Sequence, residues 1–419
     1  MESVDVLMIG AGEYTTGFVR GQHGAASDKP AGVIAVTLID LRRRGLVNRL
    51  ALCNSTGLEF KPIREQLRTK IADVYKNMDV SLATFPPDDV ELDPLAYQAA
   101  IKTMKKGDAV TIFTPDDTHF DMAMAAIESG LHVLLAKPAV KTLDQHRRLC
   151  EAARSRSVLV AVEYHKRFDI VYADAKERIR SELGGFSFFS STMTQPKKQL
   201  HTFAGWAGKS SDISYYLNSH HIDVHAWAVG EESRPEEVVA MASDGVANRM
   251  IDREVEDTIT LMVQWRSKDG SKGTALYTAS WISPLGDCHT QQYFHYMGQK
   301  GELRVDQAHR GYTHAMDGHG FSSLNPLYMR YKPDAKGFFA GQMGYGYRSV
   351  EKFVETVRDL NSGKKSFADV EDEGVLATIH GGMKVTAILE AGRVSLDNSG
   401  RPVAIHYDDE GAPIAVSVC

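Results

Sequence analysis

The sequence has few cysteines and no long apolar run, and these two absences exclude several classes of protein. Its 419 residues include four cysteines, Cys53, Cys150, Cys288 and Cys419, at spacings that fit neither a CxxC metal site nor a disulfide framework. No apolar stretch reaches the roughly 18 residues that a transmembrane helix needs. The acidic start at residues 1–5 lacks the basic and apolar regions of a secretory signal. We therefore expect a soluble, cytoplasmic protein.

The charge is close to balanced, which removes the global electrostatic argument for a nucleic-acid or membrane partner. There are 48 Lys and Arg against 54 Asp and Glu, which gives a formal net charge of −6. Hydrophobic residues make up 43% of the chain, enough for a core in each of roughly two or three domains. We expect a small-molecule partner.

The first 165 residues alternate short apolar runs with helical patterns, as βαβ units around a parallel sheet do. The sequence predicts strands at residues 4–9, 33–39, 109–113, 132–135 and 158–162, with a helix at residues 120–129. This pattern predicts an α/β fold, a doubly wound Rossmann domain over residues 1–165.

The pattern changes after residue 165 and predicts a second, α+β domain over residues 166–419 with a large, open, mainly antiparallel sheet. Residues 258–265 and 274–281 are expected to form a hairpin across Ser267–Gly270. Helices are predicted at residues 347–361 and 373–394. Residues 316–325 and 331–346 are rich in glycine and aromatics and are expected to be loops, which at this length are often functional.

Gly10-Ala11-Gly12 closes the first predicted strand and opens a predicted helix. Backbone amides at such a turn can hold a pyrophosphate, and Glu13 and Tyr14 are then part of the cofactor-binding loop. The third glycine of the usual GxGxxG pattern is replaced by Thr15, so a plain tight turn is the alternative.

Asp40 closes the run at residues 33–39, where a carboxylate can accept hydrogen bonds from a ribose. Arg42, Arg43 and Arg44 follow and can supply the guanidinium that the phosphate of NADP needs. A solvated helix start is the alternative for these arginines.

Two further segments lie where open α/β sheets place ligands, at the carboxyl ends of strands. Thr114-Pro115 and His119 follow the third strand, and Lys137 follows the fourth. An ammonium at that position can orient a hydroxyl or polarise a carbonyl, and partial burial lowers its pKa. A surface lysine is the alternative.

The densest group of chemically active residues is Asn218 to His225. His220 and Asp223 share one face of a predicted helix, as do His221 and His225. The spacing fits a general acid or base supported by a carboxylate, a metal site, or histidines that belong to the core. The dinucleotide fold upstream favours the first.

Taken together, these motifs resemble the Gfo/Idh/MocA oxidoreductases. The resemblance is carried by Gly10 to Gly12, Thr114 to His119, Ala126 to Pro138, Tyr164 to Phe168, His220 to Asp223, Glu256 to Thr258 and Gly298 to Gly301. It implies an NAD(P)(H) cofactor, a sugar substrate, catalysis by Lys137 and His220, and a homodimer or homotetramer formed through the second domain's sheet.

The chain departs from the family pattern at three positions. Ala136 replaces a glutamate, His165 an asparagine and Tyr216 an aspartate. The loss of two acids leaves the site less negative, which suits an anionic substrate, and Tyr216 can offer it a phenolic donor. His165 stays a cofactor-binding candidate.

The long N-terminal domain, with residues 20–32 inserted, is similar to that of fungal D-galacturonate reductases of this family. This similarity implies hydride transfer to the C1 aldehyde of a uronic acid, carbonyl polarisation by Lys137 and protonation by His220. Lys166, Arg167, Lys197, Arg310 and His221 are candidates for substrate contacts, with arginine the better carboxylate receptor.

Three other functions stay open. The first is a neutral sugar, inositol or polyol dehydrogenase of the same family. The second is a metal-dependent hydrolase built on His220, His221, Asp223 and His225. The third is a nucleotide-sensing protein without turnover.

Overall fold

The computed structural model describes residues 3–19, 29–284, 291–318 and 320–419. Cys288 and most of the predicted insertion, residues 20–28, lie outside the described residues. The chain forms two compact units, the first of Met1–Ala139, Arg148–Phe168 and Pro326–Gly381, the second of Val140–Arg147, Asp169–Asn325 and Gly382–Cys419. The sequence predicted one boundary after residue 165, whereas in the structure the chain returns to the first unit.

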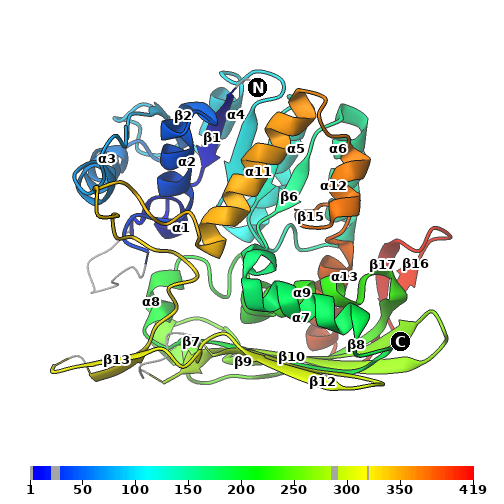
Figure 1. The fold of residues 1–419 in the computed structure, drawn as a ribbon. Helices are drawn as coiled ribbons and strands as arrows, with labels where there is room; N and C mark the ends of the chain where they lie inside the picture. The colour runs from blue at the N-terminus through cyan, green and yellow to red at the C-terminus, as the bar shows by residue number, and fades with distance from the viewer. Residues whose placement is uncertain (1–2, 20–28, 285–290, 319) are drawn as a thin grey trace. The chain divides into compact units, whose positions relative to one another are not determined.

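The first unit contains a doubly wound sheet, as predicted (Figure 1). Its strand order is β15-β6-β5-β4-β1-β2-β3, and all pairs are parallel except β15 with β6. The strands are β1 (Val4–Ile9), β2 (Val47–Cys53), β3 (Ala83–Phe85), β4 (Ala109–Ile112), β5 (His132–Leu135), β6 (Val160–Val162) and β15 (Ala377–Thr378). The order reverses between β1 and β4, which is where such sheets bind ligands.

Helices pack on both faces of this sheet because the central strands are buried on both sides. A core joins side chains of α2 (Ile34–Arg43), α3 (Phe60–Leu67) and α11 (Tyr345–Asn361) to sheet residues such as Val6, Met8 and Leu52. The remaining helices of this unit include α1 (Glu13–Thr16), α4 (Ala96–Ile101), α5 (His119–Glu128) and α12 (Phe367–Glu373); α6 (Leu143–Arg156) crosses between the two units.

The strand predicted at residues 33–39 is wrong, because these residues form α2 and the second strand is Val47–Cys53. Every side chain from Ile34 to Leu41 is buried, so the sequence has no polar face to reveal the helical period. The amide of Val33 donates to the carbonyl of Tyr14 at 2.7 Å. The short helix α1 ends with the left-handed Gly17, and α2 begins beside it.

The second unit contains an eight-stranded sheet in the order β12-β11-β7-β10-β9-β8-β16-β17. β7 and β10 are parallel and the other pairs antiparallel, as the predicted mainly antiparallel sheet requires. The strands are β7 (Phe186–Pro196), β8 (Ser233–Ser243), β9 (Thr258–Ser267), β10 (Lys272–Ser283), β11 (Gln292–Gly298), β12 (Glu302–Asp306), β16 (Val403–Tyr407) and β17 (Pro413–Val418). The predicted hairpin of β9 and β10 is confirmed.

One side of this sheet carries α7 (Ile170–Ser181), α9 (Ser219–Val229) and α13 (Met383–Asp397) (Figure 1). Along β9, Leu261 and Val263 are buried and Met262 between them is exposed, as expected for a sheet covered on one side. The long predicted helix at residues 373–394 is two helices, because α12 ends at the left-handed Gly374 and α13 begins at Met383.

A small hairpin, β13 (Thr313–Met316) with β14 (Gly320–Ser323), occupies part of the loop predicted at residues 316–325. Residues 331–344 contain no helix or strand, in agreement with the second predicted loop.

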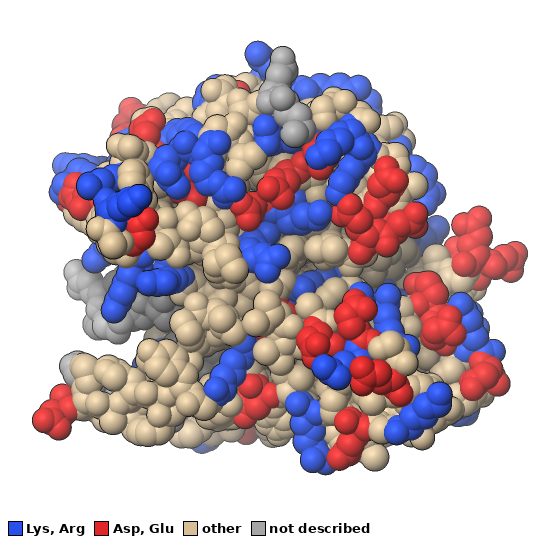
Figure 2. All heavy atoms as spheres, in the orientation of Figure 1, with Lys and Arg blue, Asp and Glu red and all other residues tan. Residues whose placement is uncertain are grey.

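No helix among the described residues is long and apolar enough to cross a membrane. Basic and acidic side chains are interspersed over the face of the molecule drawn in Figure 2.

Candidate functional site

The turn after β1 allows close approach to the backbone. Gly10 has φ +96°, and a Cβ there would lie 2.1 Å from the carbonyl oxygen of Phe113, so only glycine fits. Gly12 caps α1, is exposed, and has no described heavy atom within 4 Å of the position of a Cβ. The turn therefore fits a pyrophosphate, which would contact the backbone between Gly10 and Gly12, with Ala11, Glu13 and Tyr14 beside it.

A buried carboxylate, Glu163, lies at the carboxyl end of β6, and the sequence analysis missed it. Its Oε2 lies 2.9 Å from Nδ1 of His165, and its Oε1 accepts hydrogen bonds from the hydroxyls of Ser349 at 2.7 Å and Tyr14 at 3.4 Å. The amide of Glu163 donates to the carbonyl of Leu135 in β5 at 2.8 Å. The signal that singled out Lys137, a polar residue just beyond the end of a buried strand, also applies to Glu163.

Aromatic rings surround this carboxylate. Tyr14 stacks on Phe113 with ring centroids 5.2 Å apart, and His165 stacks on Tyr345 at 5.6 Å. Tyr328 lies 5.3 Å from the ring of His165. Burial raises the pKa values of Tyr14 and Tyr328 well above their ordinary value, so both phenols stay neutral and can donate hydrogen bonds.

Lys137 lies two residues beyond β5, at the same edge of the sheet. Burial lowers the pKa of its ammonium to about 7, and the negative charges of Asp116 and Glu163 oppose this shift. Near neutral pH the side chain is therefore poised between a charged hydrogen-bond donor and a neutral amine.

Of the predicted residues between Thr114 and His119, the histidine has a structural role. His119 is fully buried, and its ring nitrogens lie 2.9 Å from the carbonyl oxygen of Thr114 and 3.0 Å from that of Pro138. It thus joins the loops after β4 and β5. Pro115 caps a short 3₁₀ helix, and the hydroxyl of Thr114 accepts a hydrogen bond from Thr118 at 2.7 Å.

The position predicted for Asp40 is wrong, because Asp40 lies within α2 and not at the end of a strand, and the cofactor role predicted for Asp40, Arg42 and Arg43 loses its structural basis. Asp40 is buried and accepts hydrogen bonds from Arg43 at 2.8 Å and Tyr347 at 2.7 Å. Arg42 donates to the carbonyl of Ser81 at 2.8 Å. The residue that follows β2 is Asn54.

Arg44, also weighed as a phosphate ligand, donates to the hydroxyl of Tyr347 at 2.7 Å and forms an ion pair with Glu351.

In the second unit, two of the three histidines on α9 serve the core. Nε2 of His221 lies 3.0 Å from the hydroxyl of Tyr172. Nδ1 of His225 lies 2.5 Å from the hydroxyl of Tyr277, its ring stacks on Phe189 at 4.4 Å, and burial lowers its pKa to about 3. The substrate contact predicted for His221 is therefore not supported by its hydrogen bond into the core.

The metal-site interpretation loses two of its four ligands in this way. Among the described residues, no group of three or more His, Cys, Asp or Glu side chains is arranged to hold a metal ion. His220 and Asp223 are both buried on α9.

Tyr216 lies four residues before His220, on a π-helical turn, Ser214–Asn218, that leads into α9. Its hydroxyl accepts a hydrogen bond from Nε2 of Gln195 at 3.4 Å, and its ring stacks on Trp281 at 5.5 Å. The structure thus brings Tyr216 and His220 together on continuous helix.

The candidate carboxylate receptors differ in how far they are engaged. Nη2 of Arg310 forms an ion pair with the buried carboxylate of Asp169 at 2.5 Å, whereas its Nε and Nη1 are buried and have no hydrogen-bond partner among the described residues. Nη1 of Arg167 donates to the carbonyl of Leu376 at 3.3 Å, and both Arg167 and Lys166 are buried. Lys197 is half-buried just beyond β7.

Comparison with known proteins finds a match to one family model in the first part of the chain. Residues 4–164 match the Gfo/Idh/MocA model, described as an oxidoreductase family with an NAD-binding Rossmann fold. The NAD(P)(H) cofactor predicted from the sequence is confirmed at that level. The scyllo-inositol 2-dehydrogenase (NAD(+)) of Bacillus subtilis is 40% identical over 200 residues, which are 48% of this chain and 55% of that protein.

The chain spans about half the length of the curated relatives it matches, or less. The matched segment is 34% of one relative's length and 55% of another's. Two solved structures share the fold of nearly the whole chain. Myo-inositol 2-dehydrogenase from Lactobacillus plantarum has a TM-score of 0.66 at 19% identity and covers 97% of this chain and 100% of its own. Scyllo-inositol dehydrogenase from Lactobacillus casei, with bound NAD(H) and scyllo-inositol, has a TM-score of 0.66 at 15% identity over 96% and 99% of the two chains.

Proposed function

Because residues 4–164 match the model of the Gfo/Idh/MocA oxidoreductases, we propose that the whole chain is an NAD(P)-dependent oxidoreductase that interconverts a CH–OH group of a sugar or polyol and a carbonyl. The observation that carries this proposal is the group formed by Lys137, Glu163 and the glycine turn at the carboxyl edge of one sheet. Such an edge is where doubly wound sheets place a dinucleotide and the reacting substrate.

Bound NAD(P) supplies the donor or acceptor of the hydride. Lys137, as an ammonium, donates a hydrogen bond to the substrate oxygen and stabilises the negative charge that develops there. From the family resemblance we assign to His220 the proton that this oxygen gains during reduction and loses during oxidation. Positioned proton transfer of this kind contributes about 10² to 10⁴ in rate.

The substrate that the geometry favours is a neutral sugar or polyol. A uronate needs a cation for its carboxylate. The charge of Arg310 is already balanced by Asp169, with only its Nε and Nη1 left without a partner among the described residues, and Arg167 holds a backbone carbonyl. The D-galacturonate reduction implied by the sequence resemblance is the competing proposal. It draws on Ala136 and Tyr216, which replace acids of the family pattern.

A spectrophotometric panel tests both proposals. Purified protein is incubated with NAD(H) or NADP(H) and with inositols, neutral aldoses or D-galacturonate, and absorbance of the reduced nicotinamide is followed. We expect turnover of at least one neutral compound to exceed that of D-galacturonate tenfold or more. Faster turnover of D-galacturonate would overturn the neutral assignment, and no turnover with any carbonyl or hydroxyl compound would overturn the enzyme assignment.

We also propose that two or four copies associate through the sheet face of the second unit that lies opposite its helices. One row of paired residues across this face runs through Met241, Thr260, Thr278, Thr192 and Tyr293, none of them charged. Met241 is 72% exposed and Tyr293 42%. A row of exposed, uncharged residues of this kind is typical of an interface.

The molecular mass in solution, measured by light scattering, checks the oligomeric state. The substitution Met262→Asp lies on the same face and should lower the measured mass from that of a dimer or tetramer to that of a smaller species. The matched control is Leu92→Asp, which charges an apolar residue of the first unit that is 70% exposed. A monomeric parent protein, or equal masses for parent and M262D, would contradict this proposal.

A further inference from the structure

Four aromatic rings gather one helical turn before His220 in the second unit. Tyr216 stacks on Trp281 at an interplanar angle of 16°, and the rings of Phe203 and Trp206 lie 5.2 Å and 5.1 Å from Tyr216. Phe203 and Trp206 are themselves 5.1 Å apart. We call these residues the aromatic platform.

The platform is only partly covered. Trp281 is fully buried and forms its base, whereas Phe203, Trp206 and Tyr216 are half-buried and keep part of their surface accessible. Gly205, between the first two rings, is exposed, and a Cβ there would meet no described heavy atom within 4 Å. A flat, partly apolar ligand can therefore reach the rings.

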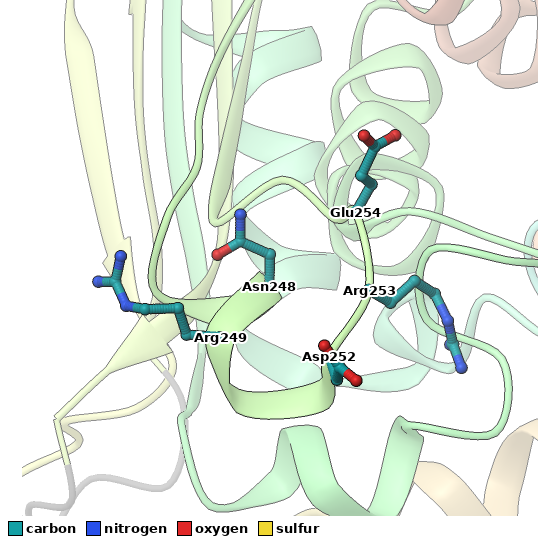
Figure 3. A pocket seen from close by; sticks show the side chains of 5 residues that line it. All are labelled: Asn248, Arg249, Asp252, Arg253 and Glu254. Atoms are coloured by element: carbon teal, nitrogen blue, oxygen red, sulfur yellow. The ribbon is translucent and has the colours of Figure 1, made fainter.

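The segment that carries Trp206 is held from one side by Arg253. Nη1 of Arg253 donates to the carbonyls of Ala204 at 2.9 Å and Ala207 at 2.6 Å. Figure 3 shows Arg253 among the residues that line a polar hollow beside α10 (Ala247–Ile251). Gly208 follows with φ +68°, and a Cβ there would lie 2.6 Å from the carbonyl oxygen of Glu254.

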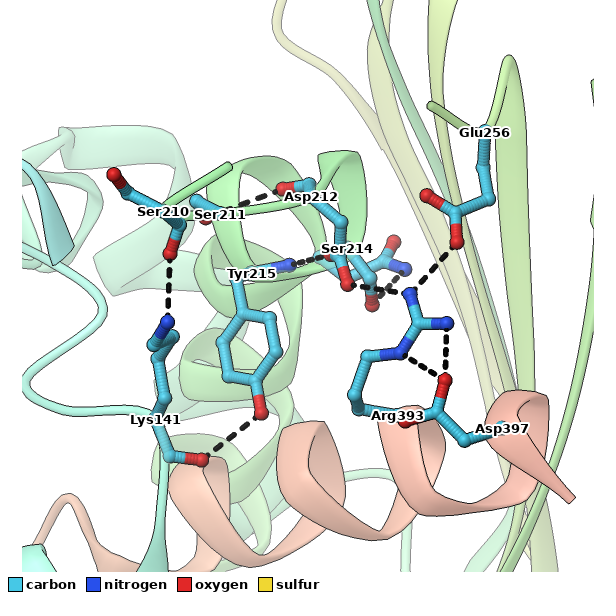
Figure 4. Close-up of polar contacts among 10 residues, drawn as sticks. Lys141, Ser210, Ser211, Asp212, Ser214, Tyr215, Glu256, Arg393 and Asp397 are labelled. Carbon is cyan, nitrogen blue, oxygen red and sulfur yellow. Dashed lines mark hydrogen bonds and ion pairs between the residues drawn. The ribbon is translucent and has the colours of Figure 1, made fainter. Parts of the chain in front are cut away.

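The segment between Trp206 and Tyr216 is also held by polar contacts. Nζ of Lys141 donates to the carbonyl of Ser210 at 2.9 Å, and the carboxylate of Asp212 accepts from the amide of Tyr215 at 2.9 Å (Figure 4). Since these polar contacts hold the segments that carry Trp206 and Tyr216, the rings are preorganised, and a ligand does not have to order them.

A polar group lies beside the platform. Nε2 of Gln195 donates to the hydroxyl of Tyr216, while Oε1 of Gln195 is buried and accepts no hydrogen bond within the described chain. A buried acceptor without a donor is costly unless a ligand supplies one. Aromatic faces with an adjacent amide match a pyranose ring, which offers C–H groups on one face and hydroxyl donors at its rim.

We propose that the aromatic platform binds a second ring, a sugar or a cyclic aglycone, joined to the sugar that reacts at His220, so that the substrate is a glycoside. Tyr216 is the platform residue nearest in sequence to His220, and Phe203 and Trp206 extend the surface onto another segment. The three accessible rings offer more surface than one pyranose covers. This inference rests on the proposed oxidoreductase function and names its substrate class.

Kinetics with three probes test the inference. Glucose, methyl β-D-glucopyranoside and phenyl β-D-glucopyranoside present the same reacting ring with no substituent, a small one and a second ring. We expect kcat/KM for the phenyl glycoside to exceed that for the methyl glycoside about tenfold, the scale of one aromatic contact. Equal values for all three probes would overturn the inference while leaving the oxidoreductase assignment standing.

Substitution of the platform provides the second arm. Trp206→Ala should reduce kcat/KM for the phenyl glycoside at least tenfold more than that for glucose, and Trp206→Phe should restore most of the loss. Trp227→Ala is the matched control, because Trp227 is also half-buried but lies near the other end of α9. A loss in W206A that is equal for all three probes would overturn the inference.

Saturation-transfer NMR with the phenyl glycoside provides a readout that does not need turnover. Transfer to the phenyl protons should be seen in the parent protein and W227A and be lost in W206A, with far-UV circular dichroism to confirm folding. Trp206-dependent transfer without turnover of the phenyl glycoside would uphold the binding site and overturn the claim that this glycoside is a substrate, while the spectrophotometric panel decides the oxidoreductase assignment separately. Transfer that W206A retains would overturn the binding site itself.

Discussion

The hydroxyl of Tyr347 donates a hydrogen bond of 2.7 Å to Oδ2 of Asp40, and this bond joins α11 to α2 inside the first unit. Nε of Arg43 donates to the other carboxylate oxygen at 2.8 Å. Gln342 contributes a further donor at 3.2 Å. The carboxylate is thus saturated by its own unit and stabilises the fold.

Asp40→Asn should therefore destabilise the protein without changing its choice of cofactor. We expect the free energy of unfolding to fall by about 1–3 kcal/mol, the usual cost of disturbing a buried charged hydrogen bond. Urea denaturation measures this loss. The control is Asp73→Asn, which removes an exposed ion pair with Arg68 and should cost less than about 1 kcal/mol. A tenfold change in the NAD-to-NADP ratio of kcat/KM in D40N would contradict the structural role.

The pKa of Lys137, lowered to about 7 by burial, predicts the pH dependence of reduction. The ammonium is present below this pKa and lost above it. Since reduction uses the charged form, kcat/KM for the carbonyl substrate should fall as the pH rises through about 7. Lys137→Arg keeps its positive charge across this pH range, so kcat/KM of this variant should no longer fall as the pH rises through about 7, even if its overall rate is low. A flat profile of the parent protein between pH 6 and 8 would exclude this role.

Glu163→Gln should lower the pH at which kcat/KM for the carbonyl substrate falls. The carboxylate of Glu163 raises the pKa of Lys137 against the effect of burial, so neutralising it favours the amine. The same pH–rate profile measures the shift. Ser349→Ala is the matched control, because it removes a 2.7 Å hydrogen bond to the same carboxylate but leaves its charge. An unchanged or higher midpoint in E163Q would show that Glu163 does not act on Lys137.

His220→Gln should lower kcat by about 10² to 10⁴, the contribution of a positioned proton donor. His221→Gln is the comparison, because His221 is its neighbour on α9 and bonds to Tyr172 in the core. We expect H221Q to lower the melting temperature with a smaller effect on kcat. The opposite ranking of the two variants, measured with the same substrate, would transfer the catalytic role to His221.

Asp212 predicts a pH effect on stability in the second unit (Figure 4). Burial raises the pKa of its carboxyl to about 6, with Glu256 raising it further and Arg393 opposing the shift. A carboxyl that holds its proton more tightly when folded stabilises the protein at low pH, and this contribution is lost as the pH rises through about 6.

Asp212→Asn has no carboxyl at this position, so its stability should not fall as the pH rises through about 6. The free energy of unfolding of the variant minus that of the parent protein should therefore be larger at pH 7.5 than at pH 4.5, by at most about 3 kcal/mol. Urea denaturation at the two pH values measures the difference. Asp397→Asn removes an exposed partner of the same Arg393 and should show little dependence. A difference of the opposite sign would contradict the assigned cause.

The strands of the first unit could be predicted because short apolar runs are bounded by Gly, Asp or Pro. The same rule failed at residues 33–39, since a fully buried helix shows no polar face and its β-branched residues mimic a strand. Because of this error, Asp40 was also placed wrongly, at the end of a strand and not within α2. Tertiary burial decided the structure of this segment, and the local sequence does not encode that burial.

The candidate site was predicted where a residue able to take part in catalysis lies just beyond the end of a strand, as Lys137 does. Glu163 satisfies the same condition, since it follows the strand predicted at residues 158–162, but no sequence motif singled it out. Phe203 and Trp206 belong to no recognised sequence motif. They form a candidate binding site only because rings from separate segments meet at Tyr216. Such convergence depends on the path of the chain, so the sequence alone did not indicate it.

The chain's late return to the first unit has a consequence for biosynthesis. Tyr347, Phe353 and Val357 complete a core begun by Val6 and Met8, so the nascent amino-terminal half leaves the ribosome with an apolar surface that its missing helix has yet to cover. Until residues 326–381 are translated, that half should depend on chaperones, and a gene truncated near codon 165 should yield an aggregating fragment.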